Sequence, residues 1–275
     1  MTIVNFLVMD GIKNKFLIID SRSKDITLTG EQIRFLADKD NIETGGCDQI
    51  AILRNSLNAD CFMEIYNSDG GEVEACGNVT RCVGWLISNE TSRVNTNIET
   101  LAGILNSERV GENRIKIDMG EARLNWDEIP LSIECDTISV PLEVDNLKNP
   151  VAVNVGNPHA VFFVDNIEAI DFSKNNLGSR IENNKIFPDR VNVGIAQIID
   201  RDNIKLRVFE RGAGETLACG TGACAATIAA IRKNLTNQNV TVELRGGNLE
   251  IEWTSNNRIF MTGNVNFERE GSIDI

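Results

Sequence analysis

The chain has little of what metal sites, catalytic triads and disulfide frameworks are built from. It contains a single histidine, His159, among 275 residues. One histidine disfavours multi-histidine metal sites and leaves only one base for a Ser-His-Asp triad. Its cysteines include no CxxC pair, so zinc-binding and thioredoxin-like sites have little support. A pyridoxal phosphate enzyme would need a Gly-rich phosphate loop and a Schiff-base lysine, and no convincing loop of this kind occurs. The sequence therefore predicts neither a metal nor a cofactor.

Positive charge and long hydrophobic runs are also scarce. Lys and Arg number 27 against 40 Asp and Glu, so the net charge is −13. Nucleic acids and anionic membranes attract clusters of Lys and Arg, and an acidic chain is a poor partner for either. No stretch approaches the length of a membrane-spanning helix, and the N-terminal residues carry no basic leader. These observations predict a cytoplasmic protein with no nucleic-acid or membrane partner.

An internal repeat singles out two of the cysteines. The segment GEVEACG at 71–77 matches GETLACG at 214–220, which places Cys219 143 residues after Cys76. The same spacing pairs polar residues elsewhere: Asn14 with Asn157, Gln49 with Asn192, Asn67 with Glu210, and Asn78 with Thr221. A packing turn that arose twice would explain the glycines but not the paired amides and thiols. We interpret the repeat as two structurally similar halves.

The number and setting of the cysteines favour free thiols. An odd number in a chain without a leader is typical of reduced cysteines. Small buried cysteines usually serve packing, and five of the seven are assigned to it. These five are Cys47, Cys61, Cys82, Cys135 and Cys224. For Cys76 and Cys219, the repeat favours a functional role instead.

Short apolar runs separated by Asn, Gly and Asp predict strands over most of the chain. Examples are residues 6–9, 62–67, 114–118, 191–199, 204–210 and 258–262. A capping box at Thr29 predicts a helix that starts there, and Ser173 is a candidate cap for a short helix near Leu177. Two further segments, starting at Cys76 and Cys219, predict buried helices. The expected fold is α/β, with two pseudo-symmetric domains, each a curved sheet or barrel wrapped around a central buried helix.

Each repeated cysteine is expected where a loop meets the first turn of a buried helix. Unpaired N–H groups and the helix dipole at such an end stabilise a thiolate, lower its pKa and bind a carboxylate. If the halves are related by a pseudo-twofold axis, the two thiols would face each other. One thiol could then remove a proton from a carbon atom while the other returns a proton to the opposite face. The sequence thus favours general acid–base catalysis with two bases and inversion of configuration.

These motifs resemble those of the diaminopimelate epimerase family. The resemblance lies in GGEVEACGN at 70–78 and ERGAGETLACGTGACAA at 210–226, with GNPHAVFFVDN at 156–166 and RVNVGIAQI at 190–198. It implies a cofactor-independent isomerase that interconverts LL- and meso-diaminopimelate in lysine and peptidoglycan-precursor biosynthesis, with a homodimeric assembly. In that family the C-terminal strand rejoins the first domain. The expected domains are therefore 1–118 plus 264–275, carrying Cys76, and 119–263, carrying Cys219.

The resemblance also implies roles for individual residues. Cys76 and Cys219 are expected to be the catalytic acid and base, with His159 and Glu210 modulating the pKa of the thiols. The expected substrate-binding residues are Asn14, Gln49, Asn67, Gly77, Asn78, Asn157, Asn192, Glu210, Arg211, Gly220 and Thr221. The first loop departs from the family pattern His-Gly-Leu-Gly-Asn-Asp-Phe, because here it reads DGIKNKF at 10–16.

Two alternatives remain open at this point. A related cofactor-independent racemase of another amino acid, similar to proline racemase, would share the fold and the paired cysteines. Those enzymes usually carry a histidine after the first Cys-Gly, whereas this chain has Asn78. A binding protein with structural or redox-sensing cysteines would share the fold but would not exchange a substrate hydrogen with solvent.

Overall fold

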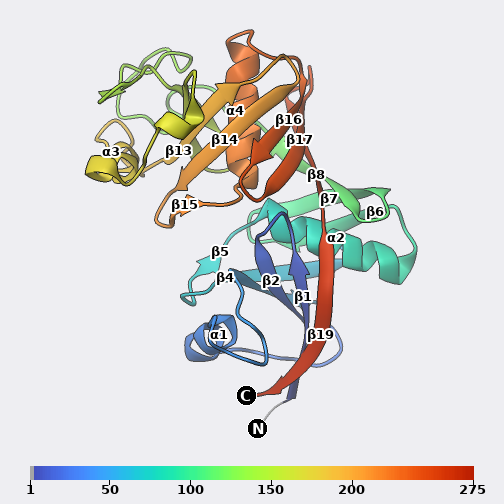
Figure 1. The fold of residues 1–275 in the computed structure, drawn as a ribbon. Coiled ribbons are helices and arrows are strands. Elements are labelled where there is room, and N and C mark those ends of the chain that lie inside the picture. The colour runs from blue at the N-terminus through green and yellow to red at the C-terminus, as the bar shows by residue number, and fades with distance from the viewer. Residues whose placement is uncertain (1–2) are drawn as a thin grey trace. The chain divides into compact units, whose positions relative to one another are not determined.

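A computed structural model describes residues 3–275, and the chain divides into two compact units (Figure 1). The first unit comprises the residues up to Asp118 together with Thr262–Ile275, and the second comprises Met119–Met261. The sequence-based division placed the second boundary after residue 263, and the structure places it after Met261, inside a strand. The C-terminal residues lie in the first unit because strand β19 (Asn266–Asp274) pairs antiparallel with strand β1 (Ile3–Asp10).

The first unit is built mainly from strands. Strand β1 pairs with β2, β2 runs parallel to β3, β3 pairs antiparallel with β4, β4 runs parallel to β6, and β7 joins β6 to β8. The short strand β5 pairs with the end of β4. Their bounds are Lys15–Asp20 for β2, Gln49–Arg54 for β3, Cys61–Asn67 for β4, Glu72–Val73 for β5, Asn95–Thr100 for β6, Gly103–Gly111 for β7 and Arg114–Glu121 for β8.

Two helices complete this unit. Helix α1 (Gly30–Ala37) starts at the capping box predicted from the sequence: the Thr29 side chain accepts from the Gln32 N–H, and the Gln32 side chain accepts from the Thr29 N–H. It packs its apolar face onto the core beneath β2 and β3. Helix α2 (Gly77–Thr91) is buried over most of its length and contacts β6 and β7. Both predicted helices are confirmed.

The second unit repeats this plan. Strand β11 (Val151–Asn154) pairs with β12 (Pro158–Phe163), which runs parallel to β13 (Asn192–Ile198). Antiparallel to β13 lies β14 (Asn203–Glu210), which pairs with the short β15 (Gly214–Thr216) and runs parallel to β16 (Asn239–Leu244). Strand β17 (Gly247–Trp253) closes on β16. The chain then enters β18 (Arg258–Asn264), which carries it back into the first unit.

Helix α4 (Gly220–Arg232) is the central element of the second unit. Its residues from Ala223 to Ala230 are fully buried, and it contacts strands β11, β12, β13, β14, β16 and β17. Figure 1 shows α4 lying against the sheet that carries β13, β14, β16 and β17. The many small Ala side chains allow this close approach. The predicted arrangement of a sheet around a buried helix is confirmed in this unit.

The strand registers confirm the internal repeat. In the first unit Phe16 on β2 lies opposite Gln49 on β3, and in the second unit His159 on β12 lies opposite Asn192 on β13. Likewise Ile65 lies opposite Val73, and Val208 lies opposite Thr216. Each pair is displaced from its equivalent by the same 143 residues as the cysteines. The repeat is therefore one of backbone pairing as well as of sequence.

Elements of the second unit outside the repeat differ from expectation. Ser173 does not cap a helix through its side chain. It precedes a 3-10 turn (Lys174–Asn176), and Asn176, in a left-handed conformation, begins helix α3 (Leu177–Glu182). A second 3-10 turn (Ile167–Ala169) is capped by Asn166. A hairpin of β9 (Glu143–Val144) and β10 (Leu147–Lys148) was not predicted, because two-residue strands leave no periodic signal.

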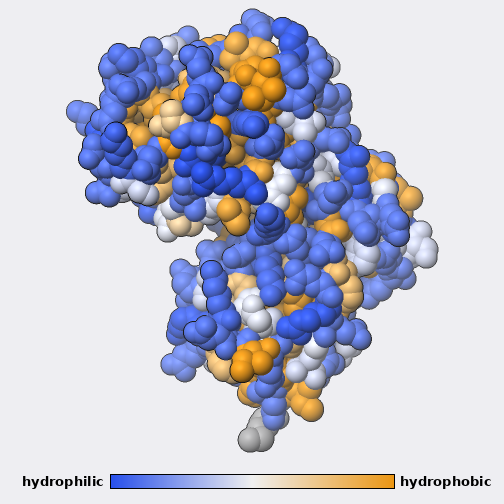
Figure 2. All heavy atoms as spheres, viewed as in Figure 1, coloured by the Kyte–Doolittle hydropathy of each residue, from blue (hydrophilic) through white to orange (hydrophobic). Residues whose placement is uncertain are grey.

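Hydrophilic side chains dominate the face of the molecule seen in Figure 2, in line with the net charge of −13. Within residues 3–275, no helix is long and apolar enough to cross a membrane.

Candidate active site

The two repeated cysteines occupy the N-cap positions of the two buried helices. Cys76 caps α2 and Cys219 caps α4, each with an extended backbone. The Gly222 N–H donates to the Cys219 sulfur over 3.3 Å, whereas the Cys76 side chain makes no capping hydrogen bond. Gly77 and Gly220 are the first residues of the two helices, so their N–H groups belong to the unpaired set at each helix start. This placement matches the sequence-based expectation for both thiols.

A chain of side-chain hydrogen bonds lies beside Cys76 in the first unit. The Arg81 guanidinium donates to the Asn78 Oδ1 over 3.0 Å, and the Asn78 side-chain NH₂ donates to the Asn14 Oδ1 over 3.2 Å. The Asn14 amide then donates to the Asp48 carboxylate over 3.0 Å. Two predicted substrate-binding residues, Asn14 and Asn78, are therefore in direct contact although they are 64 positions apart.

A tight turn holds Asn14 in place. The Gly11 N–H donates to the Asn14 backbone carbonyl over 2.9 Å. Both intervening residues, Ile12 and Lys13, have positive φ angles, of 62° and 59°. Two central residues with positive φ are typical of the tight hairpin turns that favour Asn and Gly. Ile12 is β-branched, and a β-branched residue in this conformation is strained. Where the family pattern has glycine, this chain keeps the turn with Lys13.

Gln49 and Asn67 form a second amide pair in this unit. Gln49 donates to the Asn67 carbonyl over 2.9 Å, across the antiparallel pairing of β3 and β4. The Gln49 Oε1 atom is buried and has no hydrogen-bond partner among the described residues. An unpaired buried acceptor loses the hydrogen bond that water would make, so a donor on a bound molecule would satisfy it.

The second unit carries a matching chain of hydrogen bonds that ends at a thiol. His159 Nε2 lies 2.9 Å from the Asn157 Oδ1, and the Asn157 amide donates to the Thr221 hydroxyl over 3.3 Å. The Thr221 hydroxyl lies 3.5 Å from the Cys219 sulfur. Asn157 and Thr221 are again 64 positions apart, as Asn14 and Asn78 are. A neutral imidazole with its proton on Nε2 would orient this chain toward Cys219.

Burial keeps His159 neutral. Its side chain is fully buried, and this burial, with a smaller effect of the Arg211 charge, lowers its pKa from 6.5 to about 3. The Nδ1 atom is buried and has no hydrogen-bond partner within residues 3–275. His159 is therefore linked to Cys219 through Asn157 and Thr221, and it carries no charge near neutral pH.

This histidine should make stability depend on pH in a defined window. Between pH 6.5 and pH 3 only the unfolded chain binds the proton, so the free energy of unfolding falls as pH falls through that range. Urea titrations should show a loss of about 1 kcal/mol between pH 6.5 and 5.5. His159→Gln should remove this loss, because Gln has no charge to gain. A variant with the same pH dependence as the parent would show that His159 is not the group responsible.

Glu210 contacts the second thiol directly. Its carboxylate accepts a short hydrogen bond from the Thr216 hydroxyl and interacts with Cys219. Burial raises the pKa of Glu210. Burial, and next the Glu210 charge, also raise the pKa of the Cys219 thiol well above its ordinary value, despite hydrogen bonds from Thr221 and Gly222. The expectation that a helix start lowers the thiol pKa is therefore wrong for Cys219, because burial and the Glu210 charge outweigh these hydrogen bonds.

The remaining predicted residues of the second unit that have side-chain contacts are Asn192 and Arg211. Asn192 donates to the Pro158 carbonyl over 2.9 Å and accepts from the Arg211 N–H over 3.0 Å. The Arg211 guanidinium donates to the Asp189 carbonyl, and the adjacent Gly212 N–H donates to the Glu182 carboxylate. The loop after β14 is thus anchored to its own unit. Arg211 itself is exposed.

Sequence reasoning missed four residues that hold this group together. Asp48 and Arg81 end the hydrogen-bond chain in the first unit, and Thr216 and Gly222 contact Glu210 and Cys219 in the second. The position of Arg81 three residues after Asn78 on a helix was a usable signal. Asp48 is next to Gln49 in sequence but carries no motif of its own.

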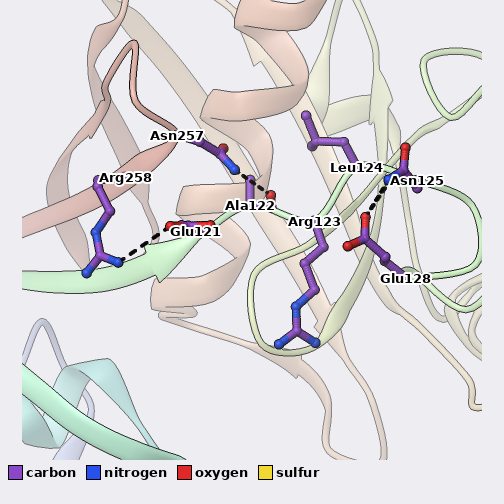
Figure 3. Close-up of a pocket in the computed structure, with 8 residues that line it drawn as sticks. All are labelled: Glu121, Ala122, Arg123, Leu124, Asn125, Glu128, Asn257 and Arg258. Carbon is purple, nitrogen blue, oxygen red and sulfur yellow. Dashed lines mark hydrogen bonds and ion pairs between the residues drawn. The ribbon is translucent and has the colours of Figure 1, made fainter.

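A polar pocket of about 620 Å³ elsewhere in the second unit contains none of the predicted residues. Figure 3 shows its lining, where Arg258 pairs with Glu121 at 4.0 Å and Asn257 donates to the Ala122 carbonyl. No group of three or more His, Cys, Asp or Glu residues that could hold a metal ion gathers within the described part of the chain.

A family model and two relatives of similar sequence share one description. A family model described as diaminopimelate epimerase matches residues 6–125 and 151–268. A diaminopimelate epimerase from a Wolbachia endosymbiont of Brugia malayi is 49% identical over 94% of this chain and 96% of its own length. One from Rhodospirillum centenum is 44% identical over 94% of this chain and 89% of its own length.

Solved structures with lower sequence identity show the fold. A phenazine biosynthesis protein of the PhzF family from Bacillus anthracis matches with a TM-score of 0.71 at 18% identity, covering 100% of both chains. A probable proline racemase from Agrobacterium radiobacter matches with a TM-score of 0.66 at 13% identity, covering 99% of this chain and 92% of its own. The sequence matches do not favour the proline racemase alternative. Because the family model matches most of the chain and relatives are 44% and 49% identical over 94% of it, the chain belongs to the diaminopimelate epimerase family.

Proposed function

We propose that this isomerase interconverts LL- and meso-diaminopimelate by moving protons with Cys76 and Cys219, without a metal or an organic cofactor. One observation carries the proposal. Each thiol caps a buried helix, and beside each lies an amide chain with the same 64-residue spacing, Asn14 to Asn78 and Asn157 to Thr221. Such duplication suits a reaction in which two groups act on opposite faces of one carbon.

In the proposed reaction one thiolate removes the α-proton and the opposite thiol donates a proton to the other face. The negative charge that develops next to the carboxylate needs fixed donors. The N–H groups of Gly77 and Asn78, and of Gly220 and Thr221, are the donors at the two helix starts. The buried, unpaired Gln49 Oε1 is an acceptor for a substrate ammonium group. Asn67, Asn157, Asn192 and Arg211 complete the proposed binding residues.

The surroundings of the two thiols suggest which one is charged in the free enzyme. Glu210 disfavours a thiolate at Cys219, whereas the equivalent position in the first unit is the neutral Asn67. We therefore assign the resting thiolate to Cys76 and the resting thiol to Cys219. This role for Glu210 fits its contacts better than binding a distal ammonium group, since its carboxylate already engages Thr216 and Cys219.

Alkylation rates test this assignment. Iodoacetamide at neutral pH should modify Cys76 before Cys219, because the thiolate is the reactive form. Glu210→Gln should speed modification of Cys219. Peptide mass spectrometry measures both rates. The Cys76→Ala variant gives the rate at which the partly exposed Cys135 is alkylated when Cys76 is absent. Faster modification of Cys219 in the parent protein would reverse the assignment.

Turnover on defined stereoisomers tests the function itself. Purified protein should convert LL-diaminopimelate to the meso form and meso to LL, reaching the same ratio from either side. Proline of either configuration should remain unchanged. Racemisation of proline without action on diaminopimelate would refute the proposal, and binding without turnover would favour the binding-protein alternative.

We further propose that the protein is a cytoplasmic homodimer, in line with its family resemblance. Sedimentation equilibrium should then give twice the chain mass of 30.3 kDa. A mass equal to that of one chain would exclude the dimer.

A further inference from the structure

Arg81 is an unusual residue to find in the core of the first unit. Its side chain is fully buried, and it is among the largest fully buried side chains of the described residues. Buried arginines are rare because removing the guanidinium from water is costly unless it is well paired. Its guanidinium donates to the Asn78 Oδ1 over 3.0 Å. It also packs closely against the first loop, where a Cβ on Gly11 would lie 3.3 Å from the Arg81 Nη2.

The position of Arg81 gives direction to the hydrogen-bond chain that it starts. A guanidinium can only donate, so the Asn78 oxygen must face Arg81 and its NH₂ must face Asn14. At the other end, the Asp48 Oδ2 accepts, so the Asn14 NH₂ must face Asp48. The Lys15 N–H also donates to the same Asp48 oxygen over 2.8 Å. With a pure donor and a pure acceptor at its ends, the chain has only one orientation for both amides.

The second unit has no equivalents of these two ends. At the equivalent positions of the second unit, Cys224 replaces Arg81 and Val191 replaces Asp48. Helix α4 and strand β13 form in the same places nonetheless. There a neutral imidazole, that of His159, supplies the donor to Asn157 instead. The side-chain amides are therefore oriented differently in the two units. Charged residues, Arg81 and Asp48, orient them in the first unit, and a neutral histidine orients Asn157 in the second.

We propose that Arg81 and Asp48 are positioning residues that lock the side-chain amides of Asn78 and Asn14 in one orientation for the α-amino and α-carboxylate groups of the substrate. The proposal rests on the proposed function for its ligand. After the chain is formed, each amide keeps one N–H and one carbonyl lone pair. These remaining groups can serve one donor and one acceptor of an amino-acid zwitterion, and without the lock either amide could turn and present the wrong group.

Kinetics of Asp48→Asn and Arg81→Met test the lock. Asp48 is exposed, so Asp48→Asn should fold normally. An Asn at position 48 can donate as well as accept, so it no longer fixes the orientation of the Asn14 amide. This variant should raise KM for LL-diaminopimelate at least tenfold, with a smaller change in kcat. Arg81→Met should lower kcat/KM by about 10- to 100-fold, and Arg81→Lys, which keeps a donor, should retain more activity. The double variant should be no worse than Arg81→Met alone, because both act on one chain.

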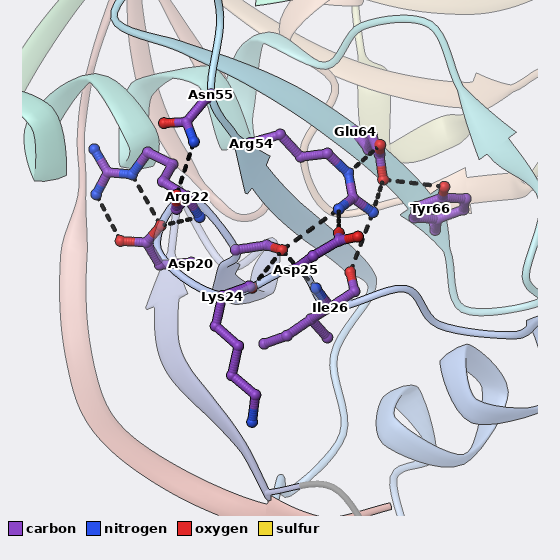
Figure 4. Close-up of polar contacts among 10 residues, drawn as sticks. Asp20, Arg22, Lys24, Asp25, Ile26, Arg54, Asn55, Glu64 and Tyr66 are labelled. Carbon is purple, nitrogen blue, oxygen red and sulfur yellow. Dashed lines mark hydrogen bonds and ion pairs between the residues drawn. The ribbon is translucent and has the colours of Figure 1, made fainter.

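A matched control is the ion-pair network of the same unit shown in Figure 4. There Arg54 pairs with Glu64 and with Asp25, at the opposite end of β3 from Gln49. Glu64→Gln should lower the melting temperature but leave KM unchanged. A purely structural role for Arg81 and Asp48 would make their variants behave like this control.

Side-chain amide NMR of the ligand-free protein gives a readout that does not depend on turnover. In the parent, the hydrogen-bonded NH₂ proton of Asn14 and that of Asn78 should exchange slowly with water, and in Arg81→Met both should exchange at least tenfold faster. An unchanged KM in Asp48→Asn, or unchanged amide exchange in Arg81→Met, would overturn the lock. If the parent protein fails to act on diaminopimelate while the amides still loosen, the proposed function fails and the lock stands.

Discussion

Replacing either Cys76 or Cys219 with alanine should abolish interconversion of LL- and meso-diaminopimelate, with a loss of at least about 10³-fold in kcat. Both thiols are needed in each direction, because inversion requires removal of a proton on one face and delivery on the other. Each single variant should nevertheless retain one partial reaction. The remaining thiol can still exchange the α-hydrogen of the stereoisomer whose hydrogen faces it, without inverting the carbon.

The controls for this experiment come from the same chain. Cys224 lies in α4 with Cys219 as its N-cap, and Cys61 lies on β4 of the first unit, both fully buried. Cys224→Ala and Cys61→Ala should retain activity, since their thiols serve packing. Stereospecific exchange followed by mass spectrometry separates the partial reactions. Retention of full epimerisation in Cys76→Ala or Cys219→Ala would show that the assigned thiol is not an acid or base.

Gly222→Ala should impair catalysis strongly through the position of a single sulfur atom. A Cβ at this position would lie 2.8 Å from Cγ2 of Val208 and 3.2 Å from Cys219 Sγ. Either the helix start or the Val208 and Cys219 side chains must shift to relieve these contacts, and a displaced sulfur loses the hydrogen bond from the Gly222 N–H. We expect a loss of about 1–3 kcal/mol in the free energy of unfolding and up to about 10²-fold in kcat.

A second crowded helix glycine separates the two effects. A Cβ on Gly84, in the middle of α2, would lie 2.5 Å from the Ser107 hydroxyl. Gly84→Ala should therefore destabilise the protein to a similar degree while leaving kcat unchanged. Thermal melts and initial rates on both variants make the comparison. Equal kinetics in Gly222→Ala and the parent would mean that the Cys219 geometry tolerates displacement.

The sequence predicted the parts of the fold that repeat and the residues that the repeat pairs. Cys76 and Cys219 lie at the helix starts as expected, and Asn14 contacts Asn78 just as Asn157 contacts Thr221. These predictions succeeded because a spacing that recurs across both halves reports shared backbone pairing. Local signals such as the Thr29 capping box also sufficed where the needed contacts lie within one helical turn.

What the sequence could not predict depends on contacts between distant segments. The pKa of Cys219 follows from its burial and from a carboxylate nine positions earlier, and the helix dipole considered alone gave the wrong direction. Asp48 and Arg81 have no equivalents in the other half, so the repeat could not reveal them. The start of α3 follows two asparagines in left-handed conformations, Asn175 and Asn176, which carry no hydrophobic periodicity.

A single-turnover reaction in deuterated water tests the two-thiol mechanism most directly. Protein in excess is mixed with LL-diaminopimelate of natural hydrogen content. Substrate and product are then separated, and their deuterium content is measured by mass spectrometry. If separate thiols remove and return the proton, the meso product carries one deuterium at the inverted carbon from the first turnover, while unreacted substrate keeps its protium. Product that retains the original hydrogen would mean that one group carries the proton between faces, and the pairing of Cys76 with Cys219 would be wrong.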